Sequence, residues 1–452
     1  MTTVDSRGAQ IAARLDRLPM SRLALRARLV IGAVTFFDGF DQLLIAYALP
    51  ALRAEYHLNA VSTTFTITVG AVGMLIGALL TGKLADRFGR VPVVTACVLV
   101  YSCTSLFAAL APSLEVLQLA RFLQGIGIGG EVLVAATYIS EIIGPKTRGR
   151  FVLVYELTFV FGLAAAALVS TWVVPAHGWR ALFAVGALPV LLAVALRTVP
   201  ESPRWLAARG RYDEAEAVLV LLEASARAQH GMLPDIVSSV PGPVAERPSV
   251  LELFRGRYLP RTLVVSVLWF TSFLVNYGIA SWLPTIYTSV FHLNVSTALT
   301  YSMITTVAGL LGNIVIATTV DLVGRRAGLI TGMLGGTLVL GSAAAVAPTQ
   351  GTQVMLFVSV AAFFVFSVNL ALNLYGPELY PTRSRAAGAS IGGVFARLGV
   401  IAGPIVTGLA FGTGAGIAAV FGVLAVTCLI GGATVALFGV ETARQPLESL
   451  SP

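Results

Sequence analysis

Apolar runs of about 20 residues recur along nearly the whole chain, and they restrict the possible folds more than any other feature. A helix that crosses the hydrocarbon core of a bilayer needs about 20 mostly apolar residues. The runs lie at 29–49, 61–81, 91–111, 115–139, 151–174, 179–197, 262–285, 298–320, 327–347, 353–375, 386–409 and 414–440. Only 12% of the residues are charged, against about 25% in soluble domains. We therefore expect an all-α integral membrane protein with 12 transmembrane helices.

Lysine and arginine are unevenly distributed among the polar segments between these runs. Alternate loops, the basic N-terminal segment and the long middle segment carry almost all of them, whereas the opposite loops hold only Arg53 and Arg180. Positive side chains are retained on the cytoplasmic side of a membrane. We therefore expect a multi-pass protein of the plasma membrane with both termini in the cytoplasm. Because this retention accounts for the net charge of +8, we expect no nucleic-acid partner.

Two parts of the chain repeat one another. Asp86, Gly89, Arg90, Arg148 and Arg150 recur as Asp321, Gly324, Arg325, Arg383 and Arg385, each 235 residues later. The repeat predicts two pseudo-symmetric six-helix bundles with a binding site between them near the bilayer midplane, as in alternating-access carriers. We expect the segments to be a cytoplasmic lead-in at 1–28, bundles at 29–198 and 262–440, a linker at 199–261 and a tail at 441–452.

The polar segments also contain short amphipathic stretches. Residues 15–28 indicate a short interfacial helix, and the linker is expected to form amphipathic helices at 212–228 and 250–258 beside the membrane.

Two acidic residues, Asp38 and Asp41, interrupt the first apolar run. A charged Asp near the centre of a membrane helix costs roughly 2.5–3.5 kcal/mol on insertion scales. Their spacing of three residues puts both on one helix face, which should point toward a protein interior or a wet cavity. We interpret the pair as proton-coupling or substrate-binding groups. The alternative is a structural role, in which they cap a helix break at Gly39.

Other charges inside the apolar runs are Arg121, Glu131 and Arg397. A buried arginine usually has a partner, and Arg121 is expected to pair with a carboxylate of the first span as a proton-coupling unit or, alternatively, as a packing ion pair. Arg397 is the candidate for holding a substrate carboxylate, because a guanidinium offers two parallel hydrogen bonds; it could instead pair with Asp41. Glu131 has either a structural hydrogen bond or a role at the substrate.

Aromatic and amide side chains complete the predicted substrate site. They are Asn276, Tyr277, Trp282, Asn313, Asn369 and Asn373. Stacking and amide hydrogen bonds suit a small aromatic acid, although they also suit a sugar. The alternative is that Trp282 marks the membrane interface and that the amides bridge helices.

A cytoplasmic gate is predicted from charged residues at the ends of the spans. It comprises Asp86, Arg90, Glu141, Arg148 and Arg150 on one side and Asp321, Arg325, Glu378, Arg383 and Arg385 on the other. Opposite charges can bridge the two halves when the cytoplasmic side is closed and separate when it opens.

Several motifs resemble those of the major facilitator superfamily, over nearly the whole chain. Residues 82–90 (GKLADRFGR) are similar to its signature between spans 2 and 3, and residues 200–206 (PESPRWL) resemble the sugar-porter branch. Residues 38–41 (DGFD) resemble aromatic acid:proton symporters, and residues 125–131 (GIGIGGE) the bacterial niacin-transporter group. The chain departs from that group at 131–134, where its members usually continue Glu-Leu-Pro-Val. The resemblance implies proton coupling through an Asp of span 1 and an Arg of span 4.

These observations predict a proton-coupled symporter that imports an aromatic or other organic monocarboxylate by alternating access. The alternatives are a carrier of a sugar or polyol, and a receptor on the same fold that binds without transport. Span 5 lacks the Gly-Pro motif of drug exporters. Because the sequence has no catalytic triad, nucleotide loop or metal-ligand cluster, we expect neither an enzyme nor a cofactor. The expected partners are the solute, protons and the lipid bilayer, and the protein is expected to be a monomer.

Overall fold

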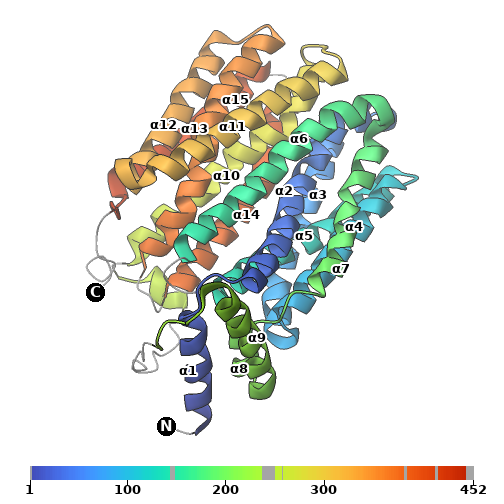
Figure 1. Ribbon diagram of the computed structural model, residues 1–452. Helices are drawn as coiled ribbons and strands as arrows, with labels where there is room; N and C mark the ends of the chain where they lie inside the picture. The colour runs from blue at the N-terminus through green and yellow to red at the C-terminus, as the bar shows by residue number, and fades with distance from the viewer. Residues whose placement is uncertain are drawn as a thin grey trace. The chain divides into compact units, whose positions relative to one another are not determined.

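Helices make up the regular structure of the residues that the computed structural model describes (Figure 1). The structure describes residues 3–142, 148–236, 250–256, 258–380, 384–412 and 416–443, and at 3–6, 148–156, 250–251 and 385–386 it describes the backbone only. The elements up to the long middle segment are α1 (Thr3–Asp16), α2 (Arg22–Tyr56), α3 (Ala60–Phe88), α4 (Arg90–Ala109), α5 (Leu114–Ile142), α6 (Arg148–Gly186), η1 (Leu188–Leu191) and α7 (Leu192–Leu196). They are followed by α8 (Pro203–Ala208), α9 (Tyr212–His230), η2 (Val250–Phe254), α10 (Tyr258–Ser289), α11 (Val295–Val323), α12 (Arg325–Val346), α13 (Gly351–Glu378), α14 (Arg385–Gly412) and α15 (Gly416–Phe438).

The predicted membrane-spanning helices are present. Among the described residues, 11 helical stretches are long and apolar enough to cross a membrane. One of them, Leu157–Leu196, has 40 residues, about twice the length that a single crossing requires. Within it Gly178 adopts φ 80° and ψ 174°, which interrupts the helix between the predicted spans at 151–174 and 179–197. The all-α membrane fold is therefore confirmed, with two predicted spans joined across a kink.

Two predictions of short helices need correction. The expected interfacial helix at 15–28 does not form, because α1 ends at Asp16 and α2 begins at Arg22. Pro19 lies in the break, where its fixed φ and missing N–H disfavour continuation of α1. The arginines at 22–28 therefore form the first turns of the first membrane helix. The expected helix at 250–258 is a short 3₁₀ turn, η2, whereas α9 agrees with the helix predicted at 212–228.

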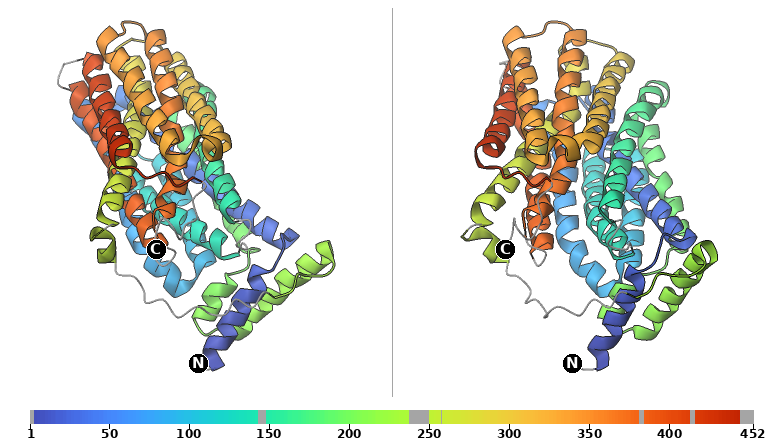
Figure 2. Two further views of the ribbon diagram at one scale, coloured as in Figure 1. Left: turned by 90° about the vertical axis from the view of Figure 1, so that its left-hand side faces the viewer. Right: turned by 60° about the vertical axis from the view of Figure 1, so that its left-hand side comes forward.

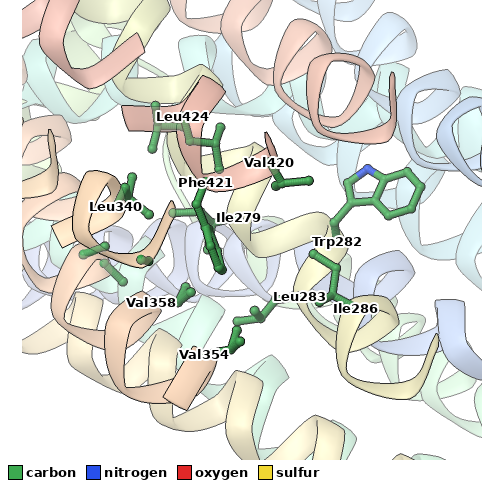
Figure 3. Close-up of a cluster of buried hydrophobic side chains, with 14 of the residues drawn as sticks. Ile279, Trp282, Leu283, Ile286, Leu340, Val354, Val358, Val420, Phe421 and Leu424 are labelled. Carbon is green, nitrogen blue, oxygen red and sulfur yellow. The ribbon is translucent and has the colours of Figure 1, made fainter. Parts of the chain in front are cut away.

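The chain divides into two compact units. The first unit consists of Met1–Gly39, Val72–Gly162 and Phe183–Val244, and the second of Phe40–Ala71, Leu163–Leu182 and Ala245–Pro452. In the second unit, α10, α12, α13 and α15 enclose a core around Trp282, Val358 and Phe421 (Figure 3). In the first unit, α2, α4 and α5 enclose a core around Val94, Tyr101 and Tyr138.

A small helical group made of α1, α8 and α9 belongs to the first unit (Figure 2). Ile11 and Leu15 of α1 pack against Trp205 of α8 and Leu219 of α9. Glu223 of α9 accepts hydrogen bonds from Arg14 Nε at 3.0 Å and from Arg17 Nη2 at 2.9 Å. These two guanidinium groups hold the pKa of Glu223 at about 2, because they stabilise its charged form.

Candidate functional site

In the first unit, Asp38 of α2 faces Glu131 of α5. Both side chains are completely buried, and their carboxyl groups lie close enough to interact electrostatically. The Cys97 thiol of α4 also lies close enough to Glu131 to interact with it electrostatically. Two acidic groups, predicted for different roles, are thus brought together on facing helices.

The close approach of these helices follows from the glycine run of α5. A Cβ atom at Gly127 would lie 2.9 Å from the carbonyl oxygen of Cys97 and from the backbone nitrogen of Tyr101 in α4. Thr81 of α3 donates its hydroxyl to the carbonyl of Gly130 at 3.1 Å. Backbone contact at this distance is possible only for residues without side chains. The run therefore positions Glu131 close to the neighbouring helices.

Arg121 occupies an earlier part of α5, ten residues before Glu131. Its Nη1 donates to Gln124 Oε1 at 2.6 Å, and its guanidinium lies 5.8 Å from the ring centroid of Phe183. The side chain of Arg121 is 5% exposed, so the amide and the aromatic face stabilise a charge that is nearly removed from water. The pairing of Arg121 with Asp38 stays a prediction.

In the second unit, a series of rings along α10 leads to Arg397 of α14. Trp269 and Phe273 have ring centroids 5.3 Å apart, and Phe273 and Tyr277 are stacked at 6.0 Å with 14° between their planes. The Tyr277 hydroxyl donates to the side-chain carbonyl of Gln42 on α2. Tyr277 and Arg397 interact electrostatically, and Arg397 Nη1 also donates to the carbonyl of Gly393 at 3.2 Å. The structure thus brings together two predicted substrate residues, Tyr277 and Arg397.

The other predicted substrate residues of this unit have different surroundings. Asn313 is buried and donates to the carbonyl of Gly309, one turn earlier, at 3.0 Å. Asn369 accepts from the Ser272 hydroxyl of α10. Asn373 donates to the carbonyl of Asn369 at 3.4 Å.

Trp282, Asn276 and Asp41 complete the predicted set in the second unit. Trp282 is fully buried in the core (Figure 3). Its indole nitrogen donates to the carbonyl of Pro404 at 2.9 Å. Asn276 is partly buried on α10, next to Tyr277. Asp41 is completely buried on α2, next to Gln42. Asp41 and Asp38 share one helix but belong to different units.

The predicted gate residues form one ionic cluster in each unit. In the first, Arg90 contacts Asp86 at 2.9 Å and Glu141 at 3.0 Å. In the second, Arg325 contacts Asp321 at 2.6 Å and Glu378 at 3.3 Å. These contacts join residues of the same unit, whereas bridges between halves were predicted. Arg383 lies outside the described residues, as do the side chains of Arg148, Arg150 and Arg385.

A second acidic group supports each cluster at a helix N-terminus. The Glu201 carboxylate accepts from the backbone N–H of Val91 at 3.2 Å, and Glu441 accepts from the N–H groups of Arg325 and Arg326 at 2.9 and 3.1 Å. Each carboxylate thereby satisfies N–H groups that have no partner within the helix. The same arrangement is built at α4 and at α12, in agreement with the internal repeat.

Several contact residues were not identified from the sequence. Gln42, Gln124, Phe183 and Phe273 had no assigned role, although Gln42 lies four residues after Asp38 and Gln124 three residues after Arg121. Residues at these spacings share a helix face. The spacing of three or four residues would therefore have identified both glutamines as neighbours of the charged residues. Phe183, in contrast, reaches Arg121 from another helix.

The long apolar helices are those of a multi-pass integral membrane protein. The family model described as "Sugar (and other) transporter" matches residues 29–452. The chain therefore belongs to this family of the major facilitator superfamily, and it is a transporter, not an enzyme.

Named relatives support this assignment, and a solved structure shares the fold. The chain is 33% identical to the niacin transporter NiaP of Acinetobacter baylyi, over 97% of this chain and 99% of that protein. It is 33% identical to the 4-hydroxybenzoate transporter PcaK of Pseudomonas putida, over 60% of this chain and 61% of that protein. The xylose transporter XylE of E. coli, in a partially occluded inward-open conformation, has the same fold, with a TM-score of 0.71 and 19% identity over 94% of this chain and 100% of that one.

Proposed function

We propose that the protein imports an aromatic or other organic monocarboxylate together with protons. The observation that carries this proposal is the series of rings on α10 that ends beside Arg397. A guanidinium can hold a carboxylate through two parallel hydrogen bonds, while neighbouring rings offer faces for stacking with an aromatic substrate. The named relatives carry niacin and 4-hydroxybenzoate, which are both aromatic carboxylates.

The proposed substrate contacts are Arg397, Tyr277, Gln42 and Asn276. Gln42 fixes the direction of the Tyr277 hydroxyl, and Tyr277 in turn lies next to Arg397. Trp282 has its indole N–H bonded to backbone inside the core, so we assign it to packing. Asn313 is bonded within its own helix, and we give it the same assignment. Asn369 and Asn373 remain candidates for the edge of the site.

Transport would follow from alternating access between two six-helix halves, 29–198 and 262–440. The ionic clusters around Arg90 and Arg325 support this proposal, because the same charges are arranged alike at corresponding helix ends. We place both termini and these clusters on the cytoplasmic side, in agreement with the distribution of arginine. Buried acidic groups on α2 and α5 would take up and release the coupled proton.

Uptake into proteoliposomes tests this function directly. The purified protein is reconstituted with or without an inward proton gradient, and radiolabelled nicotinate, 4-hydroxybenzoate, nicotinamide and D-xylose are compared. We expect the gradient to drive accumulation of the two carboxylates above the outside concentration. Accumulation of D-xylose but not of the acids would favour the alternative of a neutral solute. Binding without uptake of any compound would favour a receptor.

A further inference from the structure

Arg53 lies at the end of the second unit that is opposite the ionic cluster of Arg325. It occupies the last turn of α2, and its Nη1 donates to the Ser289 hydroxyl, at the end of α10, at 2.8 Å. The next helix, α11, begins shortly after Ser289 and runs for 29 residues to the residues beside Arg325. At 1.5 Å per residue, roughly 40 Å therefore separate the two ends of this helix.

The positive charge of Arg53 is not paired with an acidic side chain of the described chain. Its guanidinium donates to two neutral acceptors, the Ser289 hydroxyl and, at 3.3 Å, the carbonyl of Leu58. Arg180, the other arginine at this end of the unit, is instead paired with Glu55 at 2.9 Å. Two arginines and one glutamate leave this end with a net charge of +1, which is carried by Arg53. Such a charge attracts anions from solution.

The local fold does not need this guanidinium. The turn that follows α2, residues 57–59 (HLN), recurs after α10 as residues 292–294, 235 positions later. Both histidines adopt φ 51°, and both asparagines accept from a backbone N–H three residues later at 2.8 Å. The position that corresponds to Arg53 holds Thr288, whose hydroxyl donates to a carbonyl of its own helix at 3.2 Å. Because the same turn forms there without an arginine, turn formation does not account for Arg53.

We propose that Arg53 is a positioning residue that receives the carboxylate of the solute at the outer mouth, before the solute reaches Arg397. This role rests on the proposed function, which places this end of the unit outside and makes the solute an anion. The hydrogen bond of Arg53 to Ser289 is exposed, and a carboxylate is a stronger acceptor for a guanidinium than a hydroxyl is. Gln42 precedes Arg53 by 11 residues on α2, about 16 Å along the axis. The proposed contact is therefore separate from the substrate site.

Chemical modification tests anion binding at Arg53 without reference to transport. The protein in liposomes is treated with 4-hydroxyphenylglyoxal, which modifies guanidinium groups, and mass spectrometry measures the modification of Arg53 and Arg180. We expect saturating nicotinate to slow modification of Arg53 by about threefold or more and nicotinamide to have no effect, because only nicotinate carries the carboxylate. Arg180 should react at the same rate throughout. Absence of protection at Arg53, or equal protection of both arginines, would overturn the proposal. So would protection that disappears in Arg397→Ala, because it would arise from occupancy of the substrate site.

Uptake kinetics in proteoliposomes test the role of Arg53 in transport. We expect Arg53→Gln to raise the nicotinate concentration for half-maximal uptake about tenfold, and Arg53→Lys to raise it less, because lysine keeps the charge but not the planar fork. Arg180→Gln removes an equal charge from the same end and should resemble the wild type. An equal effect in Arg180→Gln would assign the result to net charge and overturn the contact. If the wild type takes up neither nicotinate nor 4-hydroxybenzoate, the proposed function fails, whereas protection of Arg53 still decides whether it binds the carboxylate.

Discussion

At the residue scale, the two units present buried charge in different chemical settings. The first holds two completely buried acidic residues, Asp38 and Glu131. The second holds a guanidinium, Arg397, which interacts with the Tyr277 hydroxyl and with a backbone carbonyl. An acidic pair is suited to holding a proton, whereas a guanidinium beside aromatic rings is suited to holding an anionic ring compound. The two settings are therefore suited to the different tasks that we propose for them, coupling and recognition.

Replacement of Arg397 should distinguish charged from neutral substrates. We expect Arg397→Ala to weaken nicotinate binding about 10- to 100-fold, because a hydrogen bond to a charged group contributes about 1.5–3 kcal/mol. Binding of nicotinamide, which lacks the carboxylate, should change less than about threefold. The measurement is the dissociation constant of each compound for the purified protein by calorimetry. Arg211→Ala, at an exposed ion pair with Glu214, is the control. Equal losses for both compounds would remove Arg397 from the carboxylate site.

At the element scale, helix positions could be predicted from the sequence better than helix contacts. The apolar runs predicted the membrane helices, and α9 was predicted from its amphipathic pattern. The membrane helices are apolar around most of their circumference, so their sequences do not mark which face meets which neighbour. The contact of Arg121 with the ring of Phe183 joins residues far apart in the chain, and no local rule identifies it. In contrast, the contact of Arg121 with Gln124 follows from a spacing of three.

The glycine run of α5 gives a test of helix packing. We expect Gly127→Ala to lower the stability of the protein by about 1–3 kcal/mol, the usual cost of overpacking a core, because the new methyl group would lie 2.9 Å from the backbone of α4. Gly82→Ala in α3 is a matched control, since no atom outside its own helix lies within 4 Å of the position that its methyl group would take. The measurement is the thermal midpoint in detergent. A midpoint for Gly127→Ala at or above that of the control would contradict the close packing of α4 and α5.

Docking of α1 depends on Glu223 and should depend on pH. The folded-state pKa of Glu223, about 2, is below its ordinary value of 4.5, so its ion pairs stabilise the docked helix fully above about pH 4.5. That stabilisation is lost as the pH falls from about 4.5 toward 2. We expect Glu223→Gln to release α1 already at pH 7.

Hydrogen exchange measures this release. In the wild type, the backbone amides of α1 should exchange slowly at pH 7 and lose protection below about pH 4. In Glu223→Gln these amides should exchange at least about tenfold faster at pH 7. Glu214→Gln, which removes an exposed ion pair with Arg211 at the start of α9, should resemble the wild type. Unchanged protection of α1 in Glu223→Gln would show that the apolar contacts of Ile11 and Leu15 suffice to hold it.

At the scale of the whole molecule, the internal repeat has a structural counterpart. Arg90 with Asp86 and Glu141, and Arg325 with Asp321 and Glu378, form the same triangle of charges next to α4 and α12. Both central arginines are mostly buried, with side-chain exposures of 11% and 13%. Among their partners Glu141 and Glu378 are mostly buried, whereas Asp86 and Asp321 are exposed, so loss of either arginine leaves one partly buried carboxylate uncompensated, at a cost below the about 3–5 kcal/mol of a fully buried pair. A conformation that keeps the clusters intact is therefore favoured over one that opens them.

This argument predicts that loss of either arginine shifts the balance between conformations. We expect Arg90→Ala and Arg325→Ala each to increase the fraction of molecules that are open to the cytoplasm. Accessibility of single reporter cysteines to a membrane-impermeant maleimide, measured at one position near each membrane face, reports this fraction. Cys103, which is exposed, is first replaced by Ser so that the reporter alone reacts. Labelling should rise on the cytoplasmic face and fall on the outer face.

Substitution of a neighbouring arginine is the control that distinguishes loss of the ionic cluster from loss of positive charge in general. Arg87 lies over the ring of Phe88 at 5.2 Å, and Arg87→Ala removes one positive charge from the end of α3, three residues before Arg90, while leaving the ion pairs of Arg90 in place. This control should label like the wild type on both faces. If Arg90→Ala and Arg325→Ala also label like the wild type, the clusters only stabilise helix ends within each unit. A parallel response of the two variants, in contrast, requires that both repeats contribute to one conformational equilibrium, because substitutions in independent units would not change accessibility in the same direction on both faces.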